Sequence, residues 1–329
     1  MSDLNPNLIS VYVRGIRLEA EGIRSFELWP HENIKLPVAR AGDHIDVHLP
    51  AGLIRQYSLI NTGDDRRYII GVNQDLKSRG GSRHMHEGVR VGDRLQISAP
   101  RNHFELEERA TETVLVAGGI GITPLYAMAR RLIELDRRFT LYYSARSRNR
   151  AAFLDDLRHL VRGKPDAALQ TVFDDESGVA SLDPNAVVAR HPGAHLYCCG
   201  PVPLMDAFVR ACESVEPARV HLEYFGGTPL PAAPADAANP AKGFVVRLAR
   251  SGRELEVTPD VSILGTLLNN GVTVLNSCRE GVCGSCETAV LEGTPEHRDC
   301  VLSPAERAAN NTMMVCVSRC QGASLTLDI

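Results

Sequence analysis

Short runs of β-forming residues, in which apolar and polar positions partly alternate, occupy the chain up to about residue 105. Glycine, aspartate or proline falls between one run and the next, as is usual at turns. Several short strands at such spacing predict a barrel or sandwich. The predicted strands cover residues 11–20, 43–50, 55–61, 66–74 and 93–100.

A different pattern begins near Glu112, where buried strands alternate with amphipathic helices. Residues 113–117 (TVLVA) predict a strand, the glycines after it a loop, and residues 123–135 a helix with apolar side chains on one face. Thr123 is the expected N-cap of this helix and Pro124 its first residue. This alternation indicates a parallel sheet covered on both faces. Further strands are expected at 139–145, 168–173 and 195–199, with a second helix after the last.

The last third of the chain separates from the rest by composition. Residues 229–243 are rich in proline and alanine and have little to bury, which is typical of a linker. The segment after it is a small strand-rich unit with most of the cysteines. We therefore expect a multi-domain protein divided into residues 1–106, 107–228, 229–243 and 244–329.

Composition narrows the class of protein further. The chain has 329 residues, 44% of them hydrophobic, which suits two or three globular domains with real cores. Its net charge of −4 leaves no basic excess to hold nucleic acid. No apolar run is as long as a membrane span and no signal peptide is visible, so we expect a cytoplasmic protein with neither nucleic-acid nor membrane partners. Nine cysteines in a reducing compartment indicate metal ligation or free thiols.

Four cysteines of the last domain have the spacing of an iron–sulfur ligand set. Three form the pattern C-x4-C-x2-C and the fourth follows after 29 residues, which is the plant-type [2Fe–2S] arrangement. Glycines in the loop allow it to wrap closely, and neighbouring polar residues can donate to sulfur. The predicted ligands are Cys278, Cys283, Cys286 and Cys316; the glycines are Gly281 and Gly284, and the donors Ser277, Arg279 and Ser285.

Alternatives to this ligand set exist within the same domain. A zinc site usually has two C-x2-4-C pairs, whereas here one triplet has a single distant partner. Cys300 and Cys320 compete for the fourth ligand position. Cys300 follows an acidic, proline-containing stretch and is expected on a loop, while Cys316 lies in the apolar run MMVCVS, expected to be a strand beneath the cluster loop.

With these motifs the whole chain resembles the phthalate dioxygenase reductase family, and residues 244–329 resemble a plant-type ferredoxin. The resemblance implies a multi-domain fold class. An antiparallel β-barrel flavin domain comes first, an α/β parallel-sheet nicotinamide domain second, and an α+β (β-grasp) ferredoxin domain last. These would be residues 1–106, 107–228 and 244–329.

Two motifs in the first domain are similar to flavin-binding elements of the ferredoxin reductase superfamily. In the R-x-Y-S motif, arginine offers a fork for phosphate, tyrosine an aromatic surface for the flavin ring, and serine a hydrogen bond near flavin N5. In SRGGS, two glycines, an arginine and a hydroxyl can cradle a phosphate. The residues are Arg55, Gln56, Tyr57 and Ser58, and Arg79, Gly80, Gly81 and Ser82. Family members with a C-terminal ferredoxin favour FMN over FAD.

Two further motifs resemble the nicotinamide site of the same superfamily. AGGIGITP joins a strand to a helix whose N-terminus favours a pyrophosphate. CCGP follows the last predicted strand, where open α/β sheets bind ligands. The residues are Gly118, Gly119, Gly121, Thr123 and Pro124, and Cys199, Gly200 and Pro201. Phe225 resembles the aromatic residue that stacks on the flavin, and Glu223 is expected in the same network. Ser58, Cys199 and Phe225 would touch the reacting rings.

The residues alone do not decide between NADH and NADPH. Ser144 and Arg146 follow a predicted strand, and Arg146 and Arg148 could take a 2′-phosphate. Asp174 and Asp175 follow the next strand and would repel one. The family generally prefers NADH.

The resemblance implies an NADH-dependent oxidoreductase. It would pass electrons from NADH through FMN to a [2Fe–2S] cluster and on to a terminal oxygenase, in a Rieske-type ring dioxygenase or O-demethylase system, and act as a monomer. Hydride transfer to a flavin needs alignment rather than a strong acid or base. Two alternatives stay open: a stand-alone NADH-dependent reductase of small acceptors, and a redox sensor.

Overall fold

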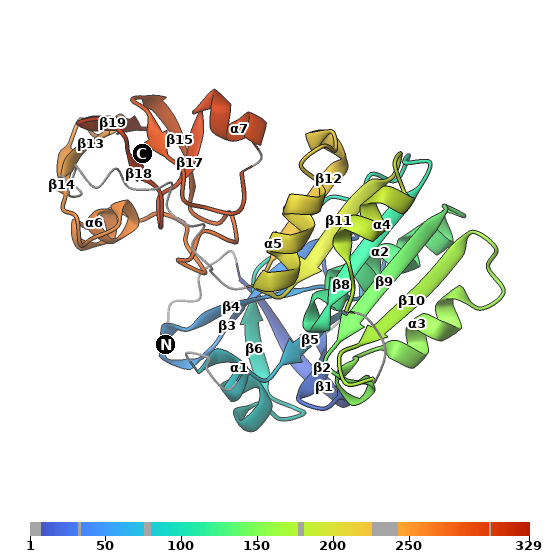
Figure 1. Ribbon diagram of the computed structural model, residues 1–329. Coiled ribbons are helices and arrows are strands. Elements are labelled where there is room, and N and C mark those ends of the chain that lie inside the picture. Colours follow the sequence, from blue (N-terminus) through green and yellow to red (C-terminus); the bar gives the residue numbers. More distant parts are fainter. Residues whose placement is uncertain (1–7, 32–33, 76–79, 177–180, 226–242, 303) are drawn as a thin grey trace. The chain divides into compact units, whose positions relative to one another are not determined.

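The computed structural model describes residues 8–31, 34–75, 80–176, 181–225, 243–302 and 304–329 (Figure 1). The chain divides into two compact units, residues 1–225 and 226–329. Almost all of the predicted linker, residues 229–242, lies outside the described residues. Each unit is therefore treated by itself.

An antiparallel sheet forms the first part of the N-terminal unit. Its strand order is β4-β3-β6-β1-β2-β5, with β7 beside β3. A bridge between Leu59 and Ile70 joins the segment after β4 to β5, so the sheet closes into a barrel. The strands are β1 (Ile9–Ala20), β2 (Ile23–Pro30), β3 (Asp43–His48), β4 (Ile54–Ser58), β5 (Tyr68–Asn73), β6 (Arg94–Ile97) and β7 (Arg101–Asn102).

The alternation predicted for these strands places their apolar residues inside the barrel. Val11 and Val13 of β1, and Ile45 and Val47 of β3, are fully buried in one core cluster. Strand β2 was not among the predicted runs. Short helical segments follow at η1 (Pro50–Gly52), α1 (Gly81–Arg83) and η2 (His84–Gly88).

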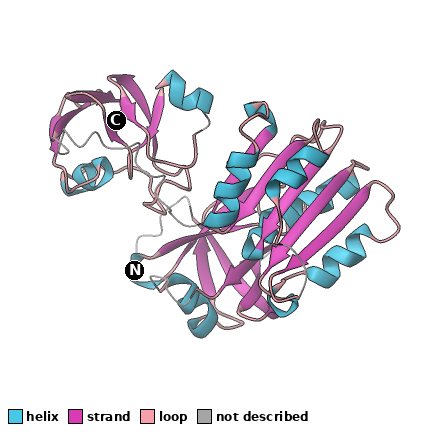
Figure 2. Ribbon diagram, in the orientation of Figure 1, coloured by secondary structure: helices cyan, strands magenta, loops and turns pink. Residues whose placement is uncertain are grey.

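A parallel sheet of order β10-β9-β8-β11-β12 forms the second part of this unit (Figures 1 and 2). Successive residues of β8 point to opposite faces of the sheet. Leu115 packs against helices α2 and α3, and Val116 packs against α4 and α5. The prediction of a sheet covered on both faces is confirmed. The elements are β8 (Thr113–Gly118), η3 (Gly119–Gly121), α2 (Ile122–Glu134), β9 (Phe139–Ala145), η4 (Arg148–Arg150), α3 (Leu154–Val161), β10 (Ala167–Phe173), α4 (Pro184–Arg190), β11 (His195–Gly200), α5 (Val202–Ala211), η5 (Pro217–Arg219) and β12 (Val220–Tyr224).

The predicted start of α2 is wrong by two residues. The N-cap is Gly121, and the helix begins at Ile122. Thr123 lies inside the first turn, where its hydroxyl donates to the Ile120 carbonyl at 3.0 Å instead of capping a free N–H. The tight η3 turn continues directly into the helix, so no extended residue separates loop from helix.

The C-terminal unit is a mixed sheet of order β14-β13-β19-β15-β17 with helix α6 packed on it. Strands β13 and β19 are parallel and their neighbours antiparallel, which agrees with the α+β class. Ser262 caps α6 by accepting a hydrogen bond from the Gly265 N–H at 3.0 Å. The elements are β13 (Phe244–Leu248), β14 (Glu254–Val257), α6 (Ile263–Asn269), β15 (Glu287–Glu292), β16 (Pro295–Glu296), α7 (Pro304–Ala309), β17 (Thr312–Met314), β18 (Arg319–Cys320) and β19 (Ser324–Leu327).

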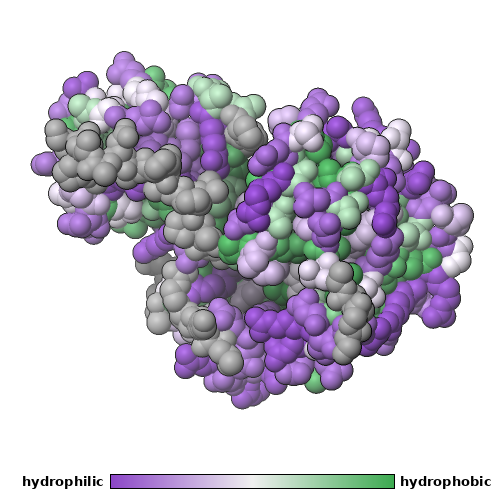
Figure 3. All heavy atoms as spheres, in the orientation of Figure 1, coloured by the Kyte–Doolittle hydropathy of each residue, from purple (hydrophilic) through white to green (hydrophobic). Residues whose placement is uncertain are grey.

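The surface in the view of Figure 3 is mostly hydrophilic. Within the residues that the structure describes, no helix has both the length and the apolar character needed to cross a bilayer.

Candidate functional site

The two flavin-type motifs meet in the barrel, although they lie far apart in the chain. Strand β4 carries the R-x-Y-S residues, so Arg55 and Tyr57 point to one side and Gln56 and Ser58 to the other. The Arg55 side chain covers Gly81 so closely that a Cβ there would lie 2.5 Å from Arg55 Nε. Glycine at this position thus lets the Arg55 side chain pack directly on the backbone of the second motif.

The remainder of the second motif lines the same corner. Gly80 has φ of 96°, a conformation that glycine adopts without strain. The Ser82 hydroxyl accepts a hydrogen bond from the Asp75 N–H at 3.2 Å. Arg79 lies outside the described residues. Backbone groups, a hydroxyl and the guanidinium of Arg55 can together hold a phosphate.

Ser58 connects the barrel to the parallel sheet. It is buried, and its hydroxyl donates to Glu223 Oε2 at 3.4 Å. Glu223 stands on β12 directly opposite Cys199 of β11. Burial raises the pKa of Glu223 to about 8, so its carboxyl group retains a proton at neutral pH. Burial and the neighbouring Glu223 also raise the pKa of the Cys199 thiol, which therefore stays neutral.

The glycine loop packs against the CCGP segment at the carboxyl edge of the sheet. A Cβ on Gly121 would lie 2.1 Å from the Cys199 carbonyl oxygen, and one on Gly118 would lie 2.6 Å from Pro201 Cδ. Gly119 has φ of 54°. Strands β8 and β11 are parallel neighbours, so the two motifs end side by side. The edge offers closely approachable backbone to a dinucleotide.

A contact that the sequence did not reveal joins the barrel to α2. Gly71 of β5 faces Thr123, and a Cβ on Gly71 would lie 2.7 Å from Thr123 Cγ2. A glycine inside a strand often marks a place where another segment approaches the strand backbone closely. Gly71 was therefore the sequence signal that could have revealed this contact. Thr123 therefore supports the loop rather than capping the helix.

The ends of β9 and β10 carry the residues considered for coenzyme choice. The Ser144 hydroxyl donates to the Ala117 carbonyl at 3.3 Å, next to the glycine loop. Arg146 is exposed. Arg148 Nε bonds Glu176 Oε1 at 2.8 Å, and its guanidinium lies 4.8 Å from the centre of the Phe173 ring. Arg148 is thus already engaged, whereas Arg146 faces solvent.

Phe225 follows β12 directly and is 40% exposed. Most large aromatic side chains in this unit are buried, so an exposed phenylalanine at the ligand edge of the sheet favours a contact with a bound ring over core packing.

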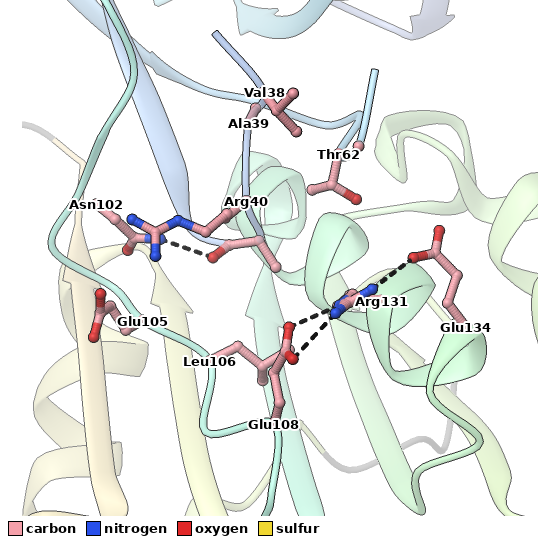
Figure 4. A pocket seen from close by; sticks show the side chains of 12 residues that line it. Val38, Ala39, Arg40, Thr62, Asn102, Glu105, Leu106, Glu108, Arg131 and Glu134 are labelled. Atoms are coloured by element: carbon pink, nitrogen blue, oxygen red, sulfur yellow. Dashed lines mark hydrogen bonds and ion pairs between the residues drawn. The ribbon is translucent and has the colours of Figure 1, made fainter. Parts of the chain in front are cut away.

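A cavity of about 450 Å³ with a mixed polar and apolar lining lies elsewhere in this unit, between the barrel and α2 (Figure 4). Arg131 on its wall bonds Glu108 through two nitrogens, at 2.7 and 3.1 Å, and also reaches Glu134. None of the predicted site residues lines this cavity.

The four predicted ligand cysteines converge in the C-terminal unit. Hydrogen bonds from Cys283 and Cys316 lower the pKa of the Cys278 thiol, and one from Cys316 lowers that of Cys286. Cys283, Cys286 and Cys316 are buried. Cys316 does not lie on a strand as expected, because β17 ends at Met314 and Cys316 occupies the turn after it. A turn lets its sulfur reach the loop.

The loop backbone is shaped for this convergence. Gly281 and Gly284 have φ of 70° and 71°. The Glu280 N–H donates to Cys278 Sγ at 3.3 Å and the Ser285 N–H to Cys283 Sγ at 3.4 Å. Of the other expected donors, Arg279 bonds Asn276 Oδ1 at 3.0 Å.

Four converging sulfurs, with N–H groups directed at them, suit an iron–sulfur cluster. The contacts run in the order Cys283, Cys278, Cys316, Cys286. Among the described residues, no three His, Cys, Asp or Glu side chains gather as they would around a single ion. Four cysteine thiolates are the number that a [2Fe–2S] cluster requires, two on each iron. Cys320 instead contacts the Ser324 carbonyl and the Gly322 N–H.

Two family models match the chain. "2Fe-2S iron-sulfur cluster binding domain" matches residues 246–321, and "Oxidoreductase NAD-binding domain" matches residues 115–210. Together with the fold, these define an NAD-binding iron–sulfur oxidoreductase.

The curated relatives are similar along their whole length. Phenoxybenzoate dioxygenase subunit beta of Ectopseudomonas oleovorans is 48% identical over 98% of this chain and 97% of its own. Tetrachlorobenzoquinone reductase of Sphingobium chlorophenolicum is 44% identical over 99% of both. The reductase subunit of phthalate 4,5-dioxygenase from Pseudomonas putida is 40% identical over 94% of this chain and 93% of its own.

Solved structures resemble this chain over almost all of its length. Phthalate dioxygenase reductase, described as modular for electron transfer from pyridine nucleotides to [2Fe–2S], has a TM-score of 0.68 and 37% identity over 98% of both chains. A self-sufficient cytochrome P450 monooxygenase has a TM-score of 0.89 and 35% identity; the match covers all of this chain and 43% of that one. The chain belongs to the phthalate dioxygenase reductase family.

Proposed function

We propose that this protein is the reductase component of a Rieske-type oxygenase system. It takes electrons from NADH and delivers them, by way of FMN and a [2Fe–2S] cluster, to a terminal oxygenase that acts on an aromatic or related compound. The observation that carries the proposal is the contact of Ser58 with Glu223, because it joins the flavin motif to the strand edge where the nicotinamide motifs end. Relatives of full length that are named as oxygenase reductase subunits support it.

We assign the flavin to the corner formed by the two barrel motifs. Bound FMN would supply the conversion of a two-electron hydride into single electrons. Arg55, with the Gly80–Ser82 backbone, would hold its phosphate, and Tyr57 would cover its ring. Gln56 belongs to the same segment, and Arg79 completes the proposed set from outside the described residues.

We assign NADH to the carboxyl edge of the parallel sheet. Gly118, Gly119 and Gly121 admit its pyrophosphate next to the start of α2, while Thr123 and Pro124 fix that start. Cys199, Gly200 and Pro201 would flank the nicotinamide, and Ser144 and Arg146 the adenosine ribose. Phe225 would cover the flavin face until the nicotinamide arrives.

The chain's own contribution is alignment and the exclusion of water. Ser58 presents a hydroxyl where the reacting rings would meet, and Glu223 keeps a proton beside it at neutral pH. Cys199, fully buried and neutral, packs beneath them as an apolar support and not as a nucleophile.

Cys278, Cys283, Cys286 and Cys316 are the proposed ligands of the cluster.

We propose that the chain is divided into residues 1–106, 107–228, 229–243 and 244–329. We also propose that the protein acts as a monomer. We further propose a cytoplasmic location, where a reducing environment keeps cysteines available as ligands.

A second candidate function is supported by one relative. Tetrachlorobenzoquinone reductase is as similar to this chain as the oxygenase subunits are, which favours direct reduction of a small quinone. Such a reaction needs no protein acceptor.

The two candidates are separated by acceptor kinetics. The purified protein, with NADH, is assayed with a Rieske oxygenase expressed from the neighbouring genes and, separately, with a substituted benzoquinone. We expect oxygenase turnover that saturates at micromolar oxygenase and disappears in Cys283→Ser. Quinone reduction that is equally fast in wild type and Cys283→Ser, with no oxygenase turnover, would favour the second function.

A further inference from the structure

A buried carboxylate lies directly behind the cysteine loop of the C-terminal unit. Asp299 has an exposed fraction of 0%. A Cβ on Gly281, between the first two ligand cysteines, would lie 3.1 Å from Asp299 Cα and 3.3 Å from its Cβ. The next residue, Cys300, donates its N–H to the Gly281 carbonyl at 2.8 Å. The loop is therefore packed against Asp299 and the Val317 side chain, since the same Cβ would lie 2.6 Å from Val317 Cγ2.

The Asp299 carboxylate ties the surroundings of the loop together. Oδ2 accepts hydrogen bonds from the N–H groups of Val301 at 3.1 Å and Leu302 at 2.9 Å. Oδ1 accepts one from the Ser318 hydroxyl at 3.4 Å. Ser318 lies two residues beyond Cys316, so the carboxylate is bonded to the segment that follows the fourth proposed ligand, while Asp299 itself and the Cys300 N–H contact the loop between the first two.

The charge of Asp299 is only partly balanced. Arg307 Nη2 lies 3.8 Å from Oδ2 and also bonds the Asp299 carbonyl, and the Arg307 side chain is 29% exposed. His297 Nδ1 lies 3.9 Å from Oδ1, and carries charge only if protonated. A charge in the protein interior acts on its neighbours far more strongly than one in water.

We propose that Asp299 is a positioning residue that also sets the reduction potential of the iron–sulfur cluster. Its buried negative charge opposes the arrival of an electron at the cysteine loop, and Arg307 acts in the opposite sense. Its hydrogen bonds meanwhile fix Val301, Leu302 and Ser318, in the segments next to the loop. The inference rests on the proposed function, in which these four cysteines hold the [2Fe–2S] group.

The test uses the full-length protein and its Asp299→Asn and Arg307→Gln variants. Asparagine keeps a carbonyl oxygen for the Val301 and Leu302 N–H groups but removes the charge. Iron content and visible absorption establish that each variant holds the cluster, and spectroelectrochemical titration then gives its potential. Asp299→Asn should shift the potential upward by about 59 mV, a tenfold larger equilibrium constant for one-electron reduction. Arg307→Gln should shift it downward.

Asp328→Asn is the matched control, because Asp328 is an acid of the same unit that forms an ion pair with Arg250 at 2.9 Å with 42% of its side chain exposed. It should leave the potential unchanged. An unchanged potential in Asp299→Asn with a full complement of iron would overturn the proposal. If Asp299→Asn loses its cluster, the potential of Arg307→Gln tests the proposal instead. An unchanged or raised potential in Arg307→Gln would contradict the proposal. A wild-type protein without any cluster would instead contradict the proposed function, and this inference with it.

Discussion

The Ser58 hydroxyl donates to Glu223 Oε2 at 3.4 Å across a separation of 165 residues in the chain. Ser58 ends a barrel strand, and Glu223 lies on the edge strand of the parallel sheet. This contact brings the flavin-type and nicotinamide-type motifs to one place. It also buries a carboxyl group that retains its proton near neutral pH.

Replacing Glu223 by glutamine should change how stability depends on pH. The pKa of Glu223 is about 8 in the folded protein against an ordinary 4.5. Between these values the folded state binds more protons than the unfolded state, so Glu223 makes the protein less stable as pH rises through this window. The difference between these pKa values corresponds to a loss on the order of 5 kcal/mol across the window, which should be absent from Glu223→Gln. Thermal unfolding from pH 4.5 to 9 measures it; parallel curves for the two proteins would contradict the assignment.

Gly121→Ala should damage the nucleotide site. The added Cβ would lie 2.1 Å from the backbone oxygen of Cys199, which cannot move without displacing β11. We expect a loss of about 1–3 kcal/mol of stability or more, together with a large rise in the KM for NADH. Gly193→Ala is the control, since nothing lies within 4 Å of its added Cβ. Equal KM values for the two variants would show that the loop does not form the site.

Arg55→Ala should weaken FMN retention by about 1.5–3 kcal/mol, because a charge-assisted phosphate contact is lost. The dissociation constant is measured by flavin fluorescence on reconstitution. Arg17→Ala is the control, because the Arg17 side chain lies on the exposed surface of β1. This variant should bind FMN normally. Recovery of FAD as the sole flavin would contradict the choice of FMN while leaving electron transfer intact.

Cys283→Ser should remove the iron–sulfur absorption and the paramagnetic signal of the reduced cluster while the flavin stays bound. The reason is that the ligand lies in the C-terminal unit, whose core is separate from that of the N-terminal unit. Cys320→Ser should keep the cluster, because its sulfur contacts Ser324 and Gly322 rather than the other thiols. Loss of iron in Cys320→Ser but not in Cys283→Ser would reverse the ligand assignment.

Local chemistry was the most predictable part of this protein. The spacing of the four cysteines is a property of the sequence itself, and the structure brings their sulfurs together. The two-sided parallel sheet followed from the alternation of strands with helices. Strand β2 was missed because Ser25 and Phe26 are buried consecutively, which breaks the alternation used to find strands.

Interactions between distant segments were not predictable in the same way. The fit of Arg55 over Gly81 and that of Gly71 against Thr123 depend on the folded backbone. The helix start at Ile122 and the turn at Cys316 differ from expectation because propensity rules do not include the tight turns on either side. Asp299 had no sequence signal, since a single aspartate on a loop is normally solvated.

The last prediction concerns the route of the electrons out of the protein. Among the residues that the structure describes, the core clusters of the N-terminal unit contain none beyond Tyr224, and the C-terminal core begins at Phe244. A protein truncated after Gly227 should therefore fold, bind FMN and oxidise NADH with ferricyanide, which collects electrons directly from a flavin. It should fail with cytochrome c and with a partner oxygenase.

Full-length Cys283→Ser is the control that separates docking from electron transfer. This variant keeps the docking surface of the C-terminal unit but lacks the cluster. It should therefore fail with cytochrome c and with the oxygenase, because no one-electron carrier then follows the flavin. Rapid mixing of the intact oxidised protein with NADH should show loss of flavin absorption before that of the cluster. Oxygenase turnover at the full-length rate by the truncated protein would show that electrons leave from the N-terminal unit, and the proposed role of residues 244–329 would then be wrong.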